Sequence, residues 1–422
     1  MNSRKLSWAP SLAQLWQLQL LMKLEINCIR RRSMKIIIIG GGIAGTTAAE
    51  EIRKQDSATQ ITIIDRENYP CYSRVLLMPY VNDKVEREKM ILKKPEWYTQ
   101  KNIELMSDVE VTKIDSKNKF VETSEGRELP YDKLLITAGL NVRYTPEDKR
   151  GVVYFKTLDD ADQLKSLIKE AIAQKKNKAV IYGGGFIAMD YLAIFDHYKF
   201  DTTVLMRSGG FWSKVLSAHA QQVLKDQTEL KGIKIINDVR EIELIGETEL
   251  TGVCALGQEF ETSILGVGIG LDPDKAVLSA AGIEVGAGII CDKYLQTNVE
   301  DIYAAGDIAE YDDATIGRHI RYGNWTNAIM QGKAVALNMV GEKIGFSMVS
   351  SYATNLLGKE IVFIGDVDRT AADEVVQEVA DKQNSTELFI RNKKIVGAVI
   401  IGDVSKRTEI TKRIQNREAV SY

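Results

Sequence analysis

A glycine turn between a buried strand and a helix most constrains how this chain can fold. Residues 36–39 are four consecutive isoleucines, which is typical of a strand buried on both faces of a parallel sheet. Residues 40–45 follow at once with the spacing G-x-G-x-x-G, and residues 46–54 read as a helix. A second strand, residues 61–64, ends at Asp65. This order of strand, turn, helix, strand and acid predicts a dinucleotide-binding unit.

Each position of this unit has a physical task. Gly40 permits the tight turn, and Gly42 lets a pyrophosphate approach the backbone N–H groups at the start of the helix. Gly45 allows the helix and the strand to pack closely. Asp65, twenty residues after Gly45, is expected to accept hydrogen bonds from a ribose diol.

The same pattern occurs a second time. Residues 178–182 read as a strand, residues 189–198 as a helix and residues 202–206 as a second strand. The turn between the first strand and the helix has the key positions Gly183, Gly185 and Ala188. Two such units predict an α/β protein with two Rossmann-like domains and two nucleotide cofactors.

The composition excludes several classes of function. Lys and Arg number 55 and Asp and Glu 58, which gives a net charge of −3 and no broad electrostatic reason to bind nucleic acid. The four cysteines form no C-x-x-C pair and the three histidines lie far apart, so no metal site is predicted. This cysteine usage fits a cytoplasmic protein.

The first 33 residues read differently from the rest. Their apolar stretch, residues 12–24, is interrupted by glutamines and a lysine and is too short to span a bilayer. We therefore expect no membrane insertion, and residues 1–33 are predicted to be an extension outside a fold that begins near Met34.

From residue 34 to about residue 417 the chain resembles the flavin-dependent pyridine-nucleotide oxidoreductases with two dinucleotide-binding domains. Four segments carry the resemblance. Two of them are the crossover YDKLLITAG at 131–139 and the segment GVVYFKTLDDADQL at 151–164, which leads into the nicotinamide domain. The other two are the motif IYAAGD at 302–307 and the helix that begins at Trp325. The crossover departs from the family pattern, because Thr-Ala stands in place of Ala-Thr. The resemblance implies FAD at the first turn and NAD(P)H as substrate at the second.

Residues 69–78, YPCYSRVLLM, place the chain near rubredoxin and ferredoxin reductases and the flavin module of nitrite reductases. The disulfide reductases of the superfamily carry a C-x4-C here, whereas this chain has Cys71 alone, which we interpret as a packing residue. The implied function is therefore hydride transfer from NAD(P)H to FAD, followed by electron transfer to a small carrier of the rubredoxin or ferredoxin type. No redox-active disulfide takes part.

The resemblance also implies roles for individual residues. Arg74 is expected near the flavin ring, where its charge would favour the anionic reduced flavin. Asp190 replaces the glutamate of the family's second motif, and we expect it to pair with Arg74, so that both residues would be catalytic. The remaining positions assigned to cofactor binding are Gly40, Gly42, Ala44, Gly45, Asp65, Val111, Ala138, Gly139, Arg143, Asp307 and Trp325 for FAD, and Gly183, Gly185, Ala188 and Arg207 for the nicotinamide nucleotide.

The donor is left open between NADPH and NADH. The strand at 202–206 does not end in the acid with which many NAD enzymes bind the ribose 2′-OH, and Arg207 could meet a 2′-phosphate. This favours NADPH. Because an arginine follows the acid in many NAD enzymes too, NADH is not excluded.

The expected domains are 34–150 with 265–342 for FAD, 151–264 for NAD(P), and 343–422 as a small C-terminal α+β domain. In the last, strands are predicted at 360–364, 386–390 and 395–401, with a hairpin turn at Asn392-Lys393 and a helix over 405–417. Lys406, Arg413 and Arg417 share one stripe of that helix, which is either a carrier-docking face or a solvated face, the second being favoured.

Other functions remain open from the sequence. The protein could be an oxidase that returns electrons to dioxygen, or a flavin-binding interaction protein with weak reductase activity. A monomer or a homodimer is expected in either case.

Overall fold

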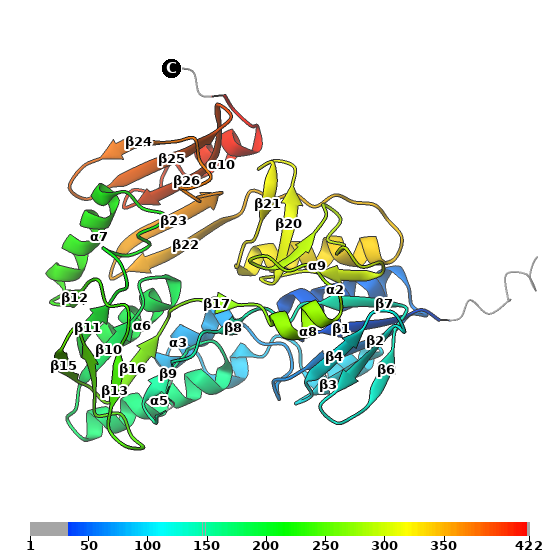
Figure 1. The fold of residues 1–422 in the computed structure, drawn as a ribbon, viewed down its shortest axis with the longest axis horizontal. Helices are drawn as coiled ribbons and strands as arrows, with labels where there is room; N and C mark the ends of the chain where they lie inside the picture. Colours follow the sequence, from blue (N-terminus) through cyan, green and yellow to red (C-terminus); the bar gives the residue numbers. More distant parts are fainter. Residues whose placement is uncertain (1–32, 146, 148, 420–422) are drawn as a thin grey trace, which may run out of the picture.

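The computed structural model describes residues 33–145, 147 and 149–419 (Figure 1). The predicted extension, residues 1–33, lies outside this part of the chain except for Ser33. In the described residues no helix is long and apolar enough to cross a membrane.

The first glycine turn belongs to a five-stranded parallel sheet with the order β19-β7-β1-β2-β3. Its strands are β1 (Lys35–Ile39), β2 (Gln60–Asp65), β3 (Ile103–Ser107), β7 (Lys133–Ile136) and β19 (Ile302–Ala304). The chain runs from β1 to β2 on one side, while β7 lies on the other side of β1. This reversal opens a crevice at the carboxyl end of β1, where ligands of such sheets bind.

Two helices cross over this sheet at close range, α2 (Ile43–Gln55) and α9 (Trp325–Met339), and they lie side by side in Figure 1. Gly332 makes the close crossing possible, because a Cβ there would lie 2.5 Å from the carbonyl oxygen of Ala44. The first glycine turn and the start of α2 are therefore packed directly against α9, the helix that follows the IYAAGD motif.

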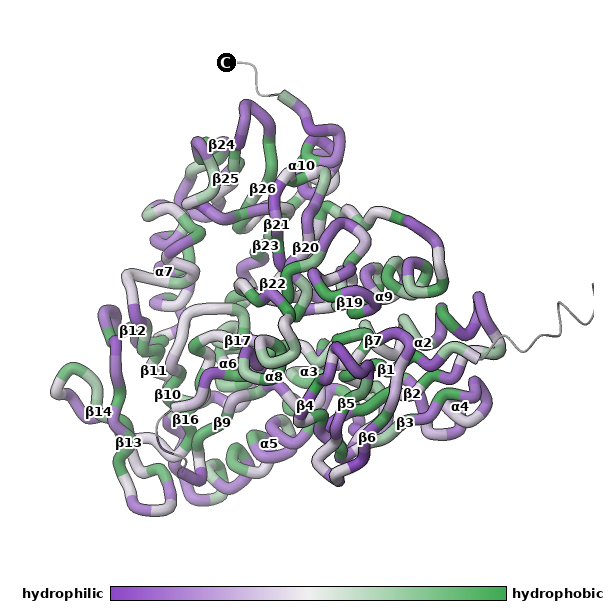
Figure 2. The backbone as a smooth tube through the Cα atoms, turned by 45° about the vertical axis from the view of Figure 1, so that its right-hand side comes forward, coloured by the Kyte–Doolittle hydropathy of each residue, from purple (hydrophilic) through white to green (hydrophobic). Residues whose placement is uncertain are grey.

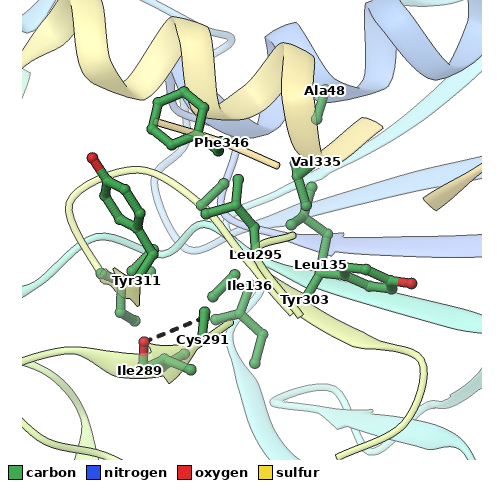
Figure 3. Close-up of a cluster of buried hydrophobic side chains, with 14 of the residues drawn as sticks. Ala48, Leu135, Ile136, Ile289, Cys291, Leu295, Tyr303, Tyr311, Val335 and Phe346 are labelled. Carbon is green, nitrogen blue, oxygen red and sulfur yellow. Dashed lines mark hydrogen bonds between the residues drawn. The ribbon is translucent and has the colours of Figure 1, made fainter. Parts of the chain in front are cut away.

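The core beneath these helices is formed by buried hydrophobic side chains (Figure 3). Leu135, Tyr303, Val335 and Phe346 meet there with Cys291, which is 2% exposed. The thiol of Cys291 donates a hydrogen bond to the carbonyl of Ile289 at 3.3 Å, and burial raises its pKa. This cysteine is a packing residue.

The second glycine turn belongs to another five-stranded parallel sheet, with the order β12-β11-β10-β16-β9. Its strands are β9 (Val152–Val153), β10 (Lys178–Tyr182), β11 (Asp201–Leu205), β12 (Lys234–Ile236) and β16 (Ile264–Val267), and its helices are α5 (Leu158–Ala173), α6 (Phe186–His197) and α7 (Ala218–Leu230). The predicted return to the first domain at residue 265 was wrong, because this residue lies inside β16, which pairs with β10. The chain returns after residue 267.

Residues 69–91 belong to the first domain by sequence but pack on the second. This segment holds η1 (Arg74–Leu76), α3 (Leu77–Val81) and η2 (Arg87–Met90). Their buried side chains, such as Leu77 and Val81, form one hydrophobic cluster with α5 and α6. The segment therefore joins the two nucleotide-binding domains.

The C-terminal domain, residues 351–415, is a five-stranded antiparallel sheet with the order β22-β23-β26-β25-β24 and one helix. Its elements are β22 (Ser351–Leu356), β23 (Lys359–Gly365), β24 (Glu374–Ala380), β25 (Ser385–Arg391), β26 (Lys394–Ile401) and α10 (Arg407–Gln415). The predicted turn at Asn392-Lys393 is confirmed, and both residues have positive φ. The sequence prediction missed β22 and β24.

Both faces of this sheet are covered. On β23, Val362 and Ile364 share a hydrophobic cluster with α10 and the core of the first domain, whereas Ile361 and Phe363 pack into the core of the second. Figure 2 shows hydrophobic stretches among the strands of this sheet, as in the other two domains. The C-terminal domain thus contacts both nucleotide-binding domains.

Small sheets and helices complete the chain. The small sheets are β4 (Val111–Asp115), β5 (Phe120–Thr123) and β6 (Glu128–Pro130); β8 (Asn141–Val142) and β17 (Leu271–Asp272); β13 (Glu243–Ile245), β14 (Gly252–Ala255) and β15 (Gln258–Glu261); and β18 (Ile289–Cys291), β20 (Ala309–Asp313) and β21 (Arg318–Ile320). The remaining helices are α4 (Pro95–Gln100) and α8 (Lys275–Ala280).

Candidate functional site

A cavity of about 800 Å³ opens at the carboxyl end of β1 and reaches all three domains. Phe186, Ile187 and Asp190 bring the start of α6 to its wall, and Tyr352 brings β22. The predicted FAD positions that line it are Gly40, Gly42, Ala44, Asp65, Arg74, Val111, Ala138, Gly139, Asp307 and Trp325. Gly45 and Arg143 are not among the lining residues.

The first glycine turn has the geometry of a phosphate cradle. Gly40 has φ +105°, and a Cβ there would lie 2.5 Å from the carbonyl oxygen of Thr137. A Cβ at Gly45 would clash with the carbonyl oxygen of Gly40, so this glycine serves packing. A Cβ at Gly42 would meet nothing within 4 Å. Gly42 is also the N-cap of α2, without a side chain over the helix end, so an anion can approach the first backbone N–H groups.

Asp65 is fixed by backbone groups on both sides. One carboxylate oxygen accepts from the N–H of Gly41 at 2.8 Å, and the other accepts from the N–H of Glu67 at 3.1 Å. Burial raises the pKa of the Asp65 carboxyl, while these two hydrogen bonds oppose the rise. The side chain is held at the cavity wall as an acceptor, as a ribose diol requires.

Arg74 does not meet Asp190, so the expected ion pair between them was wrong. Its guanidinium forms an ion pair with Glu67 and donates to Tyr72 Oη at 2.8 Å and to the Lys156 carbonyl at 2.7 Å. Glu67 follows β2 by two residues, so it shares the loop of Asp65 and reaches Arg74 without the second domain. Sequence reasoning missed Glu67, although its place after Asp65 was a usable signal.

Asp190 lines the cavity from α6 and has no charged partner there among the described residues. Burial raises the pKa of its carboxyl to about 7. The aspartate that replaces the family's glutamate thus places a carboxyl group in the cavity wall, and a large fraction of this group is protonated near neutral pH.

Lys156 is a further cation of the cavity, and the sequence analysis did not single it out. Its ammonium group donates to the carbonyl of Leu140. Burial lowers the pKa of Lys156 to about 8, with Arg74 and Arg66 acting in the same direction and Glu67 and Asp307 opposing them. Together with Arg74 it makes this side of the cavity attractive to anions.

Asp307 lies where β19 ends, as the IYAAGD motif predicts, and it lines the cavity. Burial raises the pKa of its carboxyl, and the nearby cations Arg321, Arg74 and Lys156 oppose the rise. Gly306, just before it, donates its N–H to the Gln331 side chain at 2.6 Å, which anchors the motif to α9.

The residues present fit FAD. The cradle at Gly42 is open, the acceptor Asp65 is preordered, and the Nε of Arg321 is buried without a hydrogen-bond partner among the described groups. We expect an elongated dinucleotide anion to satisfy such donors. Arg143 instead forms a two-pronged ion pair with Asp272, with distances of 2.6 and 2.8 Å, where β8 meets β17.

The second glycine turn is built like the first. Gly183 has φ +132°, and a Cβ there would clash with the carbonyl oxygen of Gly268, whereas the Cβ position of Gly185 is open. Ala188 is fully buried in α6, and Arg207 is exposed just after β11. None of these four residues lines the large cavity, but Phe186, directly after Gly185, does.

The structure also shows the surroundings of Cys71 and of the basic stripe near α10. Cys71 is 2% exposed, and burial raises the pKa of its thiol, in agreement with a packing role. Of the basic stripe near α10, Lys406 and Arg413 lie 3.8 and 3.5 Å from Glu378, and Arg417 follows the end of the helix at Gln415. This stripe is therefore partly neutralised.

Comparison with known proteins covers most of the chain. Residues 34–332 match the model of the pyridine nucleotide-disulphide oxidoreductase family, and residues 354–418 match the C-terminal domain of rubredoxin NAD+ reductase. The chain is 28% identical to a nitrite reductase [NAD(P)H] of Bacillus subtilis, with 92% of this chain and 48% of that protein covered. It thus spans about half the length of that curated relative.

Other relatives are matched over nearly their full length. The NADH-rubredoxin oxidoreductase of Clostridium acetobutylicum is 27% identical, with 92% of this chain and 96% of that protein covered. An engineered water-forming NADPH oxidase, solved with NADPH bound, superposes with a TM-score of 0.81 at 23% identity and covers 92% of both chains. The fold, both glycine turns and these matches together show that the chain belongs to the pyridine nucleotide-disulphide oxidoreductase family, with a C-terminal domain of the rubredoxin reductase type.

Proposed function

We propose that this chain is an FAD-dependent oxidoreductase that takes hydride from NADPH and passes electrons, one at a time, to a small carrier of the rubredoxin or ferredoxin type. One observation carries the proposal. The cavity that the first glycine turn opens into is closed on another side by Phe186, Ile187 and Asp190, which directly follow the second turn. A nucleotide held at the second turn would therefore reach a group held at the first.

The described residues supply positioning and charge. Gly42 and the start of α2 would hold the pyrophosphate, Asp65 the ribose and Asp307 the ribityl chain. Arg74 and Lys156 would stabilise negative charge in the cavity. FAD, when bound, supplies the hydride acceptor and the one-electron donor, so no amino-acid nucleophile is needed.

The choice of NADPH rests on the residues after β11. The engineered NADPH oxidase carries alanine in place of a glycine and, eighteen to twenty residues further on, Ala-Arg-Ser in place of Asp-Ala-Met. This chain has Ala188 and, at the same spacing, Met206, Arg207 and Ser208. An arginine and a hydroxyl at these positions suit a 2′-phosphate, and the acid that would repel it is absent.

The carrier is supported by relatives whose names include rubredoxin or ferredoxin, and by the match of residues 354–418. A monomeric or homodimeric state and a cytoplasmic location stay predictions.

An anaerobic titration tests the proposal. The purified protein should be yellow, NADPH should bleach it at lower concentration than NADH, and added rubredoxin or ferredoxin should restore the colour. A colourless protein that cannot retain FAD contradicts the proposal. Absence of bleaching by either nucleotide favours an interaction protein, and rapid recolouring by air alone favours an oxidase.

A further inference from the structure

The loop between β11 and α7, residues 206–217, connects the second nucleotide site to the C-terminal domain. It begins with Met206, which is followed by Arg207 and Ser208, and it ends at Ser217, the N-cap of α7. Its first residue, Met206, continues the sheet through backbone hydrogen bonds with Ile236 and Val239. The residues after Met206 pair with no strand, so their shape depends on turns within the loop and on contacts with neighbouring parts.

An ion pair of the C-terminal domain, between the buried Glu387 and the partly exposed Arg369, holds the far end of this loop. Glu387 on β25 is 1% exposed, and its two carboxylate oxygens accept from the N–H of Ser217 at 3.1 and 3.3 Å. Arg369 donates to Glu387 at 2.6 Å and to the carbonyl of Val215 at 3.0 Å. A buried carboxylate and its arginine thus bind two backbone groups of the loop.

An aromatic contact holds the middle of the loop. The ring centroid of Trp212 lies 5.2 Å from that of Phe363 on β23 and 5.1 Å from that of Phe186 on α6. The backbone N–H of Trp212 donates to the carbonyl of Gly184 at 3.1 Å. The loop is therefore tied both to the second glycine turn and to the C-terminal domain.

Between these contacts the loop presents groups suited to an anion. Arg207 and Lys214 are exposed and form no ion pair among the described residues. The hydroxyl oxygens of Ser208 and Ser213 lie 2.5 Å apart, so residues 208–213 form a closed turn within the loop. Cations and hydroxyls of this kind bind phosphate well only when the backbone that carries them is preordered, because ordering a loop costs conformational entropy.

We propose that Glu387 and Arg369 are positioning residues for the nicotinamide donor, which hold the loop in the shape that lets Arg207 and Ser208 bind the 2′-phosphate. This inference rests on the proposed use of NADPH. It gives the C-terminal domain a role in nucleotide affinity, although the domain itself does not contact the 2′-phosphate.

A matched pair of variants tests the inference. Glu387→Gln removes the charge that holds the loop. Asp366→Asn is the control, because Asp366 is also a buried carboxylate of the C-terminal domain, 6% exposed, but pairs with Arg318 and Arg391 and not with this loop. The probes are adenosine 2′,5′-bisphosphate and adenosine 5′-monophosphate, titrated into the FAD-loaded proteins by calorimetry.

We expect Glu387→Gln to weaken binding of the 2′,5′-bisphosphate about tenfold. The displaced loop would lose one charge-assisted hydrogen bond to the 2′-phosphate, and tenfold is the size of effect expected for such a bond. Binding of the 5′-monophosphate should change much less, and Asp366→Asn should leave the ratio of the two affinities unchanged. Arg369→Lys keeps the charge but not both hydrogen bonds, so it should show the same trend and serves if Glu387→Gln does not fold.

The contrary outcomes separate the two hypotheses. A wild-type protein that binds both probes equally overturns the use of NADPH and this inference with it. A wild-type protein that prefers the 2′,5′-bisphosphate, with an equal preference in Glu387→Gln and Arg369→Lys, overturns the inference alone. An equal loss of preference in Asp366→Asn also overturns it, because the effect would then be general to the C-terminal domain.

Discussion

Arg74 donates a hydrogen bond to the backbone carbonyl of Lys156 at 2.7 Å, and this contact joins the two nucleotide-binding domains at the cavity. Tyr72 reinforces it, because its hydroxyl accepts from the N–H of Leu158 at 3.1 Å and donates to Glu67 at 2.7 Å. The start of α5 is therefore fixed to the loop that carries Glu67. The proposed hydride transfer needs two rings at a fixed separation, so we expect this junction to matter for that activity as well as for stability.

Glu67→Gln should destabilise the protein. It removes the carboxylate that faces the guanidinium of Arg74 and leaves a charge with a poorer partner, so we expect a loss of about 1–3 kcal/mol in the free energy of unfolding. Thermal denaturation measures this as a lower Tm. Glu86→Gln is the control, since its ion pair with Lys89 is exposed, and it should leave Tm unchanged. Equal Tm values for Glu67→Gln and wild type would show that the pair is not stabilising.

Gly42→Ala and Gly45→Ala should separate cofactor binding from folding. A Cβ at Gly45 clashes with the Gly40 carbonyl, so Gly45→Ala should lower Tm of the protein without FAD. A Cβ at Gly42 meets no protein atom within 4 Å but occupies the phosphate cradle, so Gly42→Ala should keep Tm and weaken FAD binding. Quenching of FAD fluorescence measures the affinity. Full FAD affinity in Gly42→Ala would place the pyrophosphate elsewhere.

Asp190 should make stability depend on pH. Burial raises the pKa of its carboxyl to about 7, above the ordinary value of 3.8, so the folded state binds a proton that the unfolded state has released between these values. Stability from this group is therefore present at low pH and is lost as the pH rises toward 7. Asp190→Asn should raise Tm relative to wild type more at pH 8 than at pH 5. An equal difference at both pH values would contradict the raised pKa.

Lys156 should make FAD binding depend on pH. Burial, Arg74 and Arg66 lower the pKa of its ammonium group to about 8, so its charge is lost as the pH rises through that value. The affinity for the anionic cofactor should fall between pH 7 and pH 9, by up to about tenfold. In Lys156→Met the affinity should be lower at pH 7 and vary less with pH. Lys199→Met, an exposed control, should behave as wild type does, and identical curves for both variants would refute the role.

Arg207→Ala should lower kcat/KM for NADPH by about tenfold or more and leave kcat/KM for NADH nearly unchanged, because only the 2′-phosphate needs the extra cation. Steady-state reduction of a dye acceptor with both nucleotides measures the two constants. Arg240→Ala, another exposed arginine of the same domain, is the control. An equal loss with both nucleotides would mean that Arg207 does not read the 2′-phosphate.

The two glycine turns could be read from the sequence because local sterics and spacing decide them. The isoleucine run becomes β1, and Gly40 and Gly183 take the positive φ values that their places in the turn require. The hairpin at Asn392-Lys393 follows from the same local preferences. The fold class and the family were therefore accessible from the chain alone.

Only the tertiary structure decided which charges meet. Arg74 pairs with Glu67 and not with Asp190, and Arg143 pairs with Asp272 outside the cavity. Glu387 meets Ser217 across 170 residues of chain, and β16 joins a sheet that the sequence boundary had divided. Spacing along the chain specifies backbone geometry within one unit, whereas the partner of a long charged side chain depends on how separate units pack, which no local pattern records.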